Sequence, residues 1–217
     1  IRVNLKYNVK LNFKTLVSTL KDVRKYVFPY KRITNKFKGI NSLKDLESFI
    51  QERSAHVTQT TLYGYIKTRI GSRYALMFED EVFSKSINIA KWNIYVKSLA
   101  DCTFYTFSYL IDKKNLKENK AENIFTSILE DERKNGLELK IFESAKKDFK
   151  NRIELVNWNS YHKDKPFSQS SLALYNWSPI ADNLKVLDKE IVINSIKLKW
   201  NLIENEFKDL TKNLKFD

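Results

Sequence analysis

The segment from residue 178 to residue 210, "SPIADNLKVLDKEIVINSIKLKWNLIENEFKDL", decides the fold class because its apolar residues recur at three- and four-residue steps. Ser178 suits the N-cap of a helix, and Pro179 suits its first turn. One apolar stripe of this helix contains Ile180, Leu184, Leu187, Ile191, Leu198 and Leu202. A second stripe contains Val192, Ile196, Ile203, Phe207 and Leu210. Because so wide an apolar face needs two neighbours, we expect a long helix at the centre of a bundle, buried along both stripes.

The composition favours an all-α fold. Of 217 residues, only four are glycine and three are proline, so the chain has few of the turn residues that sheet folds need. The hydrophobic content of 42% is enough for a continuous core. We therefore predict an irregular helical bundle of five to seven helices with a long, central C-terminal helix and a basic N-terminal arm.

The same periodicity places the other helices. Pro29 ends the first, Ser42 with Asp45 resembles a capping box at the start of the second, and Gly71 suits a C-cap. We expect these helices at residues 12–28, 42–70, 82–112, about 124–136 and 141–156. Residues 157–171, "NWNSYHKDKPFSQSS", are expected to form a loop.

The charge is concentrated at the N-terminus. Residues 1–40 hold eleven Lys or Arg against one acid, Asp22, which is a net charge of +10 out of +13 for the whole chain. A segment with so much charge of one sign favours a phosphate-rich or anionic-lipid partner, although a solvated basic face is the alternative. We divide the chain into an arm, 1–40, and a helical domain, 41–217. The predicted polyanion-binding residues are Lys21, Arg24, Lys25, Lys31, Arg32, Lys36 and Lys38.

A second polar group lies in "TLYGYIKTRIGSRYALMFEDE", residues 61–81. Its tyrosines and basic residues are a candidate partner-contact group, because such a mixture holds phosphate and stacks on bases. The alternative is that the basic residues pair with acids inside the protein. The group contains Tyr63, Tyr65, Lys67, Arg69, Arg73 and Tyr74. We expect a corner between two helices, in which Arg73 contacts one of Glu79, Asp80 and Glu81, and these acids cap a helix instead of binding metal.

No catalytic motif is present in the sequence. The chain has two histidines, His56 and His162, and one cysteine, Cys102, which excludes an intrachain disulfide and zinc sites built from several cysteines. Gly-x-Ser-x-Gly and nucleotide-binding glycine loops are also absent. We therefore predict no catalytic residues, no metal and no cofactor. No apolar run reaches the length of about 20 residues that a membrane span needs.

Three segments resemble a known family. They are "VTQTTLYGYIKTRIGSRYALMFEDEVF", "SINIAKWNIYVKSLADC" and "WSPIADNLKVLDKEIVINSIKLKW", about a third of the chain. They look like parts of a helical, largely uncharacterised alphaproteobacterial family that is sometimes labelled esterase. The resemblance implies a helical fold and carries no catalytic residues to this chain. A start at Ile1 instead of Met, with a basic N-terminus, fits a mitochondrial descendant of such a protein.

These observations predict a non-enzymatic assembly subunit of a larger complex. It would bind a polyanion, RNA in a ribonucleoprotein, through the basic arm. One alternative is a peripheral membrane subunit whose helix at 12–28 lies on anionic lipid. Another is an esterase-like hydrolase. The expected location is the bacterial cytoplasm or the mitochondrial matrix, with the inner membrane surface as an alternative.

Overall fold

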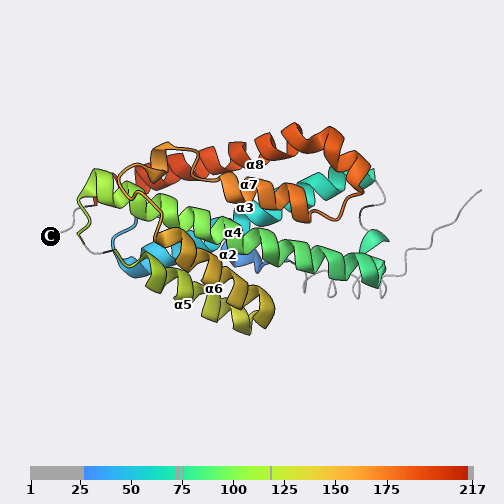
Figure 1. Ribbon diagram of the computed structural model, residues 1–217, viewed down its shortest axis with the longest axis horizontal. Coiled ribbons are helices and arrows are strands. Elements are labelled where there is room, and N and C mark those ends of the chain that lie inside the picture. Colours follow the sequence, from blue (N-terminus) through green and yellow to red (C-terminus); the bar gives the residue numbers. More distant parts are fainter. Residues whose placement is uncertain (1–26, 72–73, 75, 118, 215–217) are drawn as a thin grey trace, which may run out of the picture.

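The computed structural model describes residues 27–71, 74, 76–117 and 119–214, and these residues form a bundle of α-helices without strands (Figure 1). The predicted all-α fold is confirmed. Its α-helices are α2 (Tyr30–Thr34), α3 (Leu43–Ile70), α4 (Glu81–Lys114), α5 (Ala121–Lys134), α6 (Leu139–Ile153), α7 (Ser168–Trp177) and α8 (Asp182–Leu210). Two short 3-10 helices, η2 (Leu76–Glu79) and η3 (Tyr161–Lys163), precede α4 and α7 respectively. The predicted helix at 12–28 lies almost wholly outside the described residues.

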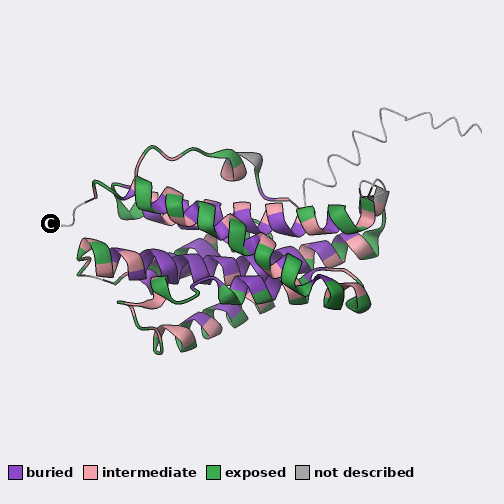
Figure 2. Ribbon diagram, turned by 90° about the horizontal axis from the view of Figure 1, so that it is seen from above, coloured by how far each residue is buried: buried purple, intermediate pink, exposed green. Residues whose placement is uncertain are grey.

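Helix α4 is the central element of the bundle. It packs against α3, α5, α6 and α7, and every residue from Leu99 to Ser108 on it is buried. A helix that is buried all round must be covered by neighbours on every side. Figure 1 shows α4 running between α8 along one long edge of the molecule and α5 with α6 along the other. Buried residues accordingly follow the inner faces of the helices, while exposed residues lie on their outer faces (Figure 2).

Three predicted helix ends are confirmed. The hydroxyl of Ser42 accepts a hydrogen bond from the amide of Asp45 at 3.1 Å, and Gly71 ends α3 with a φ of 66°. A positive φ is the conformation in which glycine meets no steric penalty. Asp80 is the N-cap of α4, because its carboxylate accepts from the amides of Val82 and Phe83. One member of the acidic triplet at 79–81, Asp80, therefore caps the helix.

The region before α8 differs from the prediction. Helix α7 begins inside the expected loop at 157–171, and Ser178 follows the end of α7 instead of starting the next helix. The Ser178 hydroxyl donates to the carbonyl of Leu174 at 2.6 Å, and α8 begins only at Asp182. The start of α7 has no local cap, since its amide at Ser170 donates to Asp101 on α4 at 2.7 Å. A cap supplied from a distant residue leaves no signal in the local sequence.

The predicted burial of α8 along both stripes was wrong. Its second stripe packs on α3 and α7, and Val192, Ile196, Ile203 and Phe207 are buried. Most of the first stripe faces solvent because α8 lies in the outer layer, where no other described element covers it, whereas Ile180 and Leu184 are half-buried. Its exposed residues are Leu187, Ile191, Leu198 and Leu202.

Candidate polyanion-binding surface

The described part of the predicted arm packs on the bundle. Phe28 is buried, its ring lies 5.5 Å from that of Trp92, and its amide donates to the side chain of Gln59 at 2.7 Å. Ile40 is also buried, and its amide donates to the carbonyl of Leu210 at 3.3 Å. Residues 28–40 are therefore a fixed strap across the helices, and an arm that projects from the bundle can only begin before them. Lys21, Arg24 and Lys25 lie outside the described residues.

Arg32, one of the predicted polyanion-binding residues, forms an internal ion pair. Its guanidinium donates to Glu132 and to Asp131, both on α5. Glu132 is fully buried and also accepts from Gln51 at 2.9 Å and from the Tyr95 hydroxyl at 3.0 Å. Because its charge is already compensated, Arg32 ties the strap to α5 and is not offered to a ligand.

Other basic residues of the strap face solvent. Lys36 and Lys38 are exposed, whereas the side chain of Lys31 is not described. The bond between Ile40 and Leu210 brings this part of the strap to the C-terminal end of α8. The C-terminal end of α4 lies there too, since Lys114 donates to the carbonyl of Lys212 at 2.7 Å.

Further lysines gather at this end of the bundle, which we call the basic end. Lys113 and Lys163 lie 3.0 and 2.9 Å from one carboxylate oxygen of Asp112, and they hold the pKa of Asp112 at about 2. Burial lowers the pKa of His162, and the positive charge of Lys163 lowers it further. The basic end comprises Lys36, Lys38, Lys113, Lys114, Lys163, Lys208 and Lys212. Strap, α4, η3 and α8 together thus supply seven lysines, of which Lys113 and Lys163 pair with Asp112 and Lys208 pairs with Glu204. No local sequence pattern predicts this gathering of lysines.

The candidate partner-contact group is mostly part of the fold. The guanidinium of Arg69 pairs with the buried Asp188 on α8, and the Tyr65 hydroxyl donates to the same carboxylate at 2.9 Å. The rings of Tyr63 and Tyr74 pack on Phe78 of η2. Arg69 therefore pairs with an acid inside the protein, which was the alternative to partner contact. Its acid comes from α8 and not from residues 79–81. Lys67 is exposed, and Arg73 lies outside the described residues, so its predicted contact stays a prediction.

A Ser–His–Asp triplet does occur, but its serine is sealed inside the bundle. The Ser108 hydroxyl lies 2.9 Å from Nδ1 of His162, and Nε2 of the same ring lies 3.5 Å from Asp112. Ser108 has an exposed fraction of 0%, and its oxygen also accepts the backbone N–H of His162 at 3.0 Å. A nucleophile must reach its substrate, which this hydroxyl cannot do. The triplet instead fastens η3 to α4.

The other candidate chemical groups are also unsuited to catalysis. Cys102 is fully buried, and burial raises the pKa of its thiol to about 12, so the nucleophilic thiolate does not form near neutral pH. Among the residues that the structure describes, no group of three or more His, Cys, Asp or Glu side chains could hold a metal ion. In the same part of the chain, no helix is both long and apolar enough to span a bilayer.

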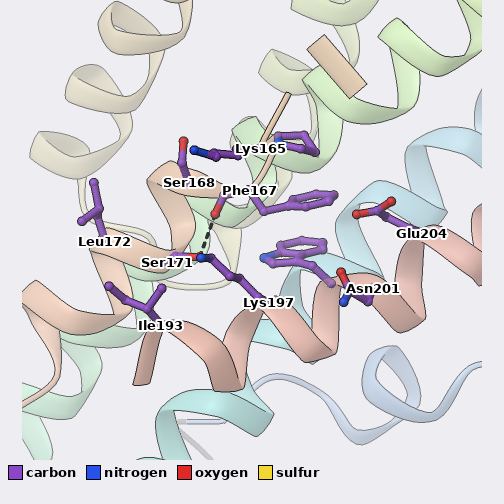
Figure 3. A pocket seen from close by; sticks show the side chains of 11 residues that line it. Lys165, Phe167, Ser168, Ser171, Leu172, Ile193, Lys197, Asn201 and Glu204 are labelled. Atoms are coloured by element: carbon purple, nitrogen blue, oxygen red, sulfur yellow. Dashed lines mark hydrogen bonds between the residues drawn. The ribbon is translucent and has the colours of Figure 1, made fainter. Parts of the chain in front are cut away.

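A mostly apolar pocket of about 450 Å³ lies between residues 165–172 and α8 (Figure 3). The stacked rings of Phe167 and Trp200, with centroids 4.3 Å apart, line it, and Lys165 and Lys197 contribute its basic groups. No histidine, cysteine or aspartate lines it. Besides the two lysines, its polar lining consists of Ser168, Ser171, Asn201 and Glu204, so the pocket offers mainly shape and apolar surface. Sequence reasoning missed this pocket because one of its walls lies in the expected loop.

The two histidines predict a loss of stability in mild acid. Burial lowers the pKa of both His56 and His162 below the ordinary value of 6.5. As the pH falls, the two histidines therefore become protonated in the unfolded chain at a higher pH than in the folded protein. The free energy of unfolding is unaffected by them above pH 6.5, and it decreases as the pH falls through 6.5 toward the folded-state pKa values. Each histidine contributes at most about 1.4 kcal/mol per pH unit.

Urea unfolding of the protein and of its His56→Gln and His162→Gln variants between pH 8 and pH 5 measures this effect. We expect each variant to reduce the slope of unfolding free energy against pH. A slope that is unchanged in both variants would contradict the assignment.

Comparisons of the chain with models of protein families, with curated proteins and with solved structures each gave no match. The class of protein is therefore defined by the fold and the surface alone. It is an all-α bundle with a basic strap and a basic end, and its described serine, histidine and cysteine candidates for catalysis are buried or engaged within the fold.

Proposed function

We propose that this chain is a non-enzymatic, polyanion-binding subunit, and that its ligand is RNA. The main observation that supports this proposal is the distribution of charge, since residues 1–40 hold +10 of the net charge of +13. Removing Arg32 from the set still leaves ten basic residues there. Two of them, Lys36 and Lys38, are exposed on the strap, which the bond between Ile40 and Leu210 holds at the C-terminal end of α8. Lysines that come from separate segments but face solvent together are suited to a phosphate backbone.

At the basic end, the exposed apolar residues of the described part favour RNA over a lipid surface. Binding at a bilayer interface requires apolar side chains beside the basic ones. In the described part of the chain, seven of the twelve exposed large apolar residues lie along α7 and α8 instead of at the basic end. They are Leu172, Trp177, Val186, Leu187, Ile191, Leu198 and Leu202.

The proposal predicts strongly salt-dependent RNA binding. Deleting residues 1–26 removes seven basic residues and one acid, a net charge of +6, without touching the buried Phe28. We expect the deletion to weaken binding of a labelled single-stranded RNA at least tenfold. The slope of log K against log salt should become less negative by about 0.7 for each phosphate that the shortened chain no longer neutralises. Fluorescence anisotropy at several salt concentrations measures both quantities.

Two charge-reversal variants distinguish RNA binding at the basic end from non-specific attraction by the net positive charge. Lys36→Glu/Lys38→Glu should weaken RNA binding, whereas Lys140→Glu/Lys147→Glu on α6 changes the net charge equally at exposed positions elsewhere and serves as the matched control. Equal losses in both variants would reduce the proposal to non-specific charge attraction. Unchanged affinity after the deletion would rule out the N-terminal segment as the binding element.

The lipid alternative makes a different prediction for the N-terminal segment. Replacing Leu16, Leu20 and Val23, which lie outside the described residues, with serine should abolish binding to anionic vesicles if an amphipathic helix inserts there. RNA binding should survive these changes. If the serine variant kept vesicle binding and lost RNA binding, the result would contradict both lipid insertion through these apolar residues and RNA binding through the basic ones.

A further inference from the structure

Helix α8 presents an apolar stripe to solvent on the side away from the core. The exposed fractions of Leu187, Ile191, Leu198 and Leu202 are 76%, 71%, 65% and 61%. Their helical positions fall within a narrow arc, so they form one continuous stripe along about 23 Å of helix. Contiguous exposed apolar surface of this kind marks an interaction site more often than isolated exposed residues do.

The spacing of the stripe is symmetric. Leu187 and Ile191 are four residues apart, Ile191 and Leu198 are seven apart, and Leu198 and Leu202 are again four apart. The stripe therefore reads the same in both directions from a midpoint between Asn194 and Ser195. A two-fold axis through that midpoint, perpendicular to α8, would generate a second, antiparallel α8. Leu187 of one copy would then lie level with Leu202 of the other, and Ile191 level with Leu198.

The polar residues beside the stripe fit the same symmetry. Glu190 and Lys197 lie on one flank of the stripe, and neither forms an ion pair within the described part of the chain. Seven residues apart on one helix, they cannot reach each other, since neighbours on a helix surface are three or four residues apart. Across the two-fold axis, Glu190 of one copy lies within about two residues of the height of Lys197 of the other. Two such contacts would form in each pair.

We infer that the exposed stripe of α8 binds a second copy of this chain, in an antiparallel helix pair with its two-fold axis between Asn194 and Ser195. Such an interface is isologous, because the same surface is used by both subunits. The symmetric spacing and the complementary flank charges favour a second copy over an unrelated partner, which would require neither. Since α8 is antiparallel to its partner, the two basic ends lie at opposite ends of the dimer. The inference does not depend on RNA binding.

Sedimentation velocity tests the dimer directly. At tens of micromolar, the wild-type protein should sediment with the mass of two chains, and Leu198→Glu should sediment with the mass of one. Leu155→Glu is the matched control, because Leu155 is 86% exposed and lies outside α8. We expect this control to remain a dimer, and all three proteins should have the same circular dichroism. A wild-type monomer at this concentration would overturn the inference.

Charge exchange tests the orientation of the pair. Glu190→Lys and Lys197→Glu each turn two attractive contacts into repulsive ones, and each should raise the dissociation constant about tenfold. An equimolar mixture of the two variants should restore the dimer, because every contact in the mixed pair is again between opposite charges. The double variant should do the same alone. Failure of both to recover would contradict the antiparallel register.

Cysteine cross-linking distinguishes antiparallel from parallel pairing. Asn194→Cys places two thiols beside the two-fold axis, so mild oxidation should produce a disulfide-linked dimer. Asn183→Cys should not cross-link, because its two copies would be about 34 Å apart at a rise of about 1.5 Å per residue. The native Cys102 is buried and should not react. Cross-linking of both variants would indicate a parallel pair, and cross-linking of neither would exclude the proposed axis.

Discussion

Replacing Arg152 with methionine is expected to lower the free energy of unfolding by about 3–5 kcal/mol, because the change leaves a buried carboxylate without its counter-charge. That carboxylate is Asp101, which has an exposed fraction of 0% at the middle of the central helix α4. Arg152 reaches it from α6 at 2.8 Å, and the amide of Ser170 donates to its second oxygen at 2.7 Å. The same carboxylate therefore joins α6 to α4 and caps α7.

A second variant isolates the charge from the packing. In Asp101→Asn/Arg152→Met the buried group is neutral, and the asparagine oxygen can still accept from Ser170, so we expect it to be more stable than Arg152→Met alone. Urea unfolding at pH 7 measures both differences. A double variant that is less stable than Arg152→Met would show that lost packing, and not the uncompensated charge, dominates.

The pH dependence of the Arg152→Met variant follows from the same ion pair. Burial raises the pKa of Asp101 above its ordinary value of 3.8, and Arg152 opposes this effect. Without the arginine, the folded protein binds the proton still more strongly than the unfolded chain does. The loss of stability should thus be largest at neutral pH and should shrink as the pH falls toward 3.8. A loss that is independent of pH would contradict an ionised Asp101.

Sequence periodicity predicted the helices whose ends are encoded locally. Ser42, Gly71 and Asp80 each act on amides or a backbone turn within a few residues. Ser42 and Gly71 were predicted individually, and Asp80 was predicted only as one of the capping acids at 79–81. Helix α7 was missed because it is short, has several hydroxyl and amide side chains, and takes its cap from Asp101, about 70 positions earlier. Local rules detect only local partners.

The exposure of α8 could not be predicted for a related reason. Its two apolar stripes are indistinguishable in sequence, and only the packing of α3 and α7 determines which one enters the core. The candidate binding surface has the same limitation. The charge asymmetry of residues 1–40 was evident, but the pairing of Arg32 with α5 and the lysines contributed by α4, η3 and α8 depend on the tertiary fold.

Replacing Arg32 with glutamine is expected to lower the free energy of unfolding by about 3 kcal/mol while leaving RNA affinity nearly unchanged. The guanidinium has only 18% of its side-chain surface exposed, and its partner Glu132 has none. The loss falls at the lower end of the range for broken buried pairs, because Gln51 and Tyr95 continue to donate to Glu132. Chemical unfolding and RNA anisotropy on the same samples measure the two effects.

The matched variants for this test carry the opposite expectation. Lys36→Gln/Lys38→Gln should leave the unfolding free energy within about 0.5 kcal/mol of wild type, because both side chains are exposed, but should weaken RNA binding. Arg32→Gln/Glu132→Gln should recover part of the stability that Arg32→Gln loses, since it removes the buried charge. If Arg32→Gln instead weakened RNA binding with little change in stability, the guanidinium would be a ligand contact, and the assignment of residues 28–40 as a structural strap would have to be withdrawn.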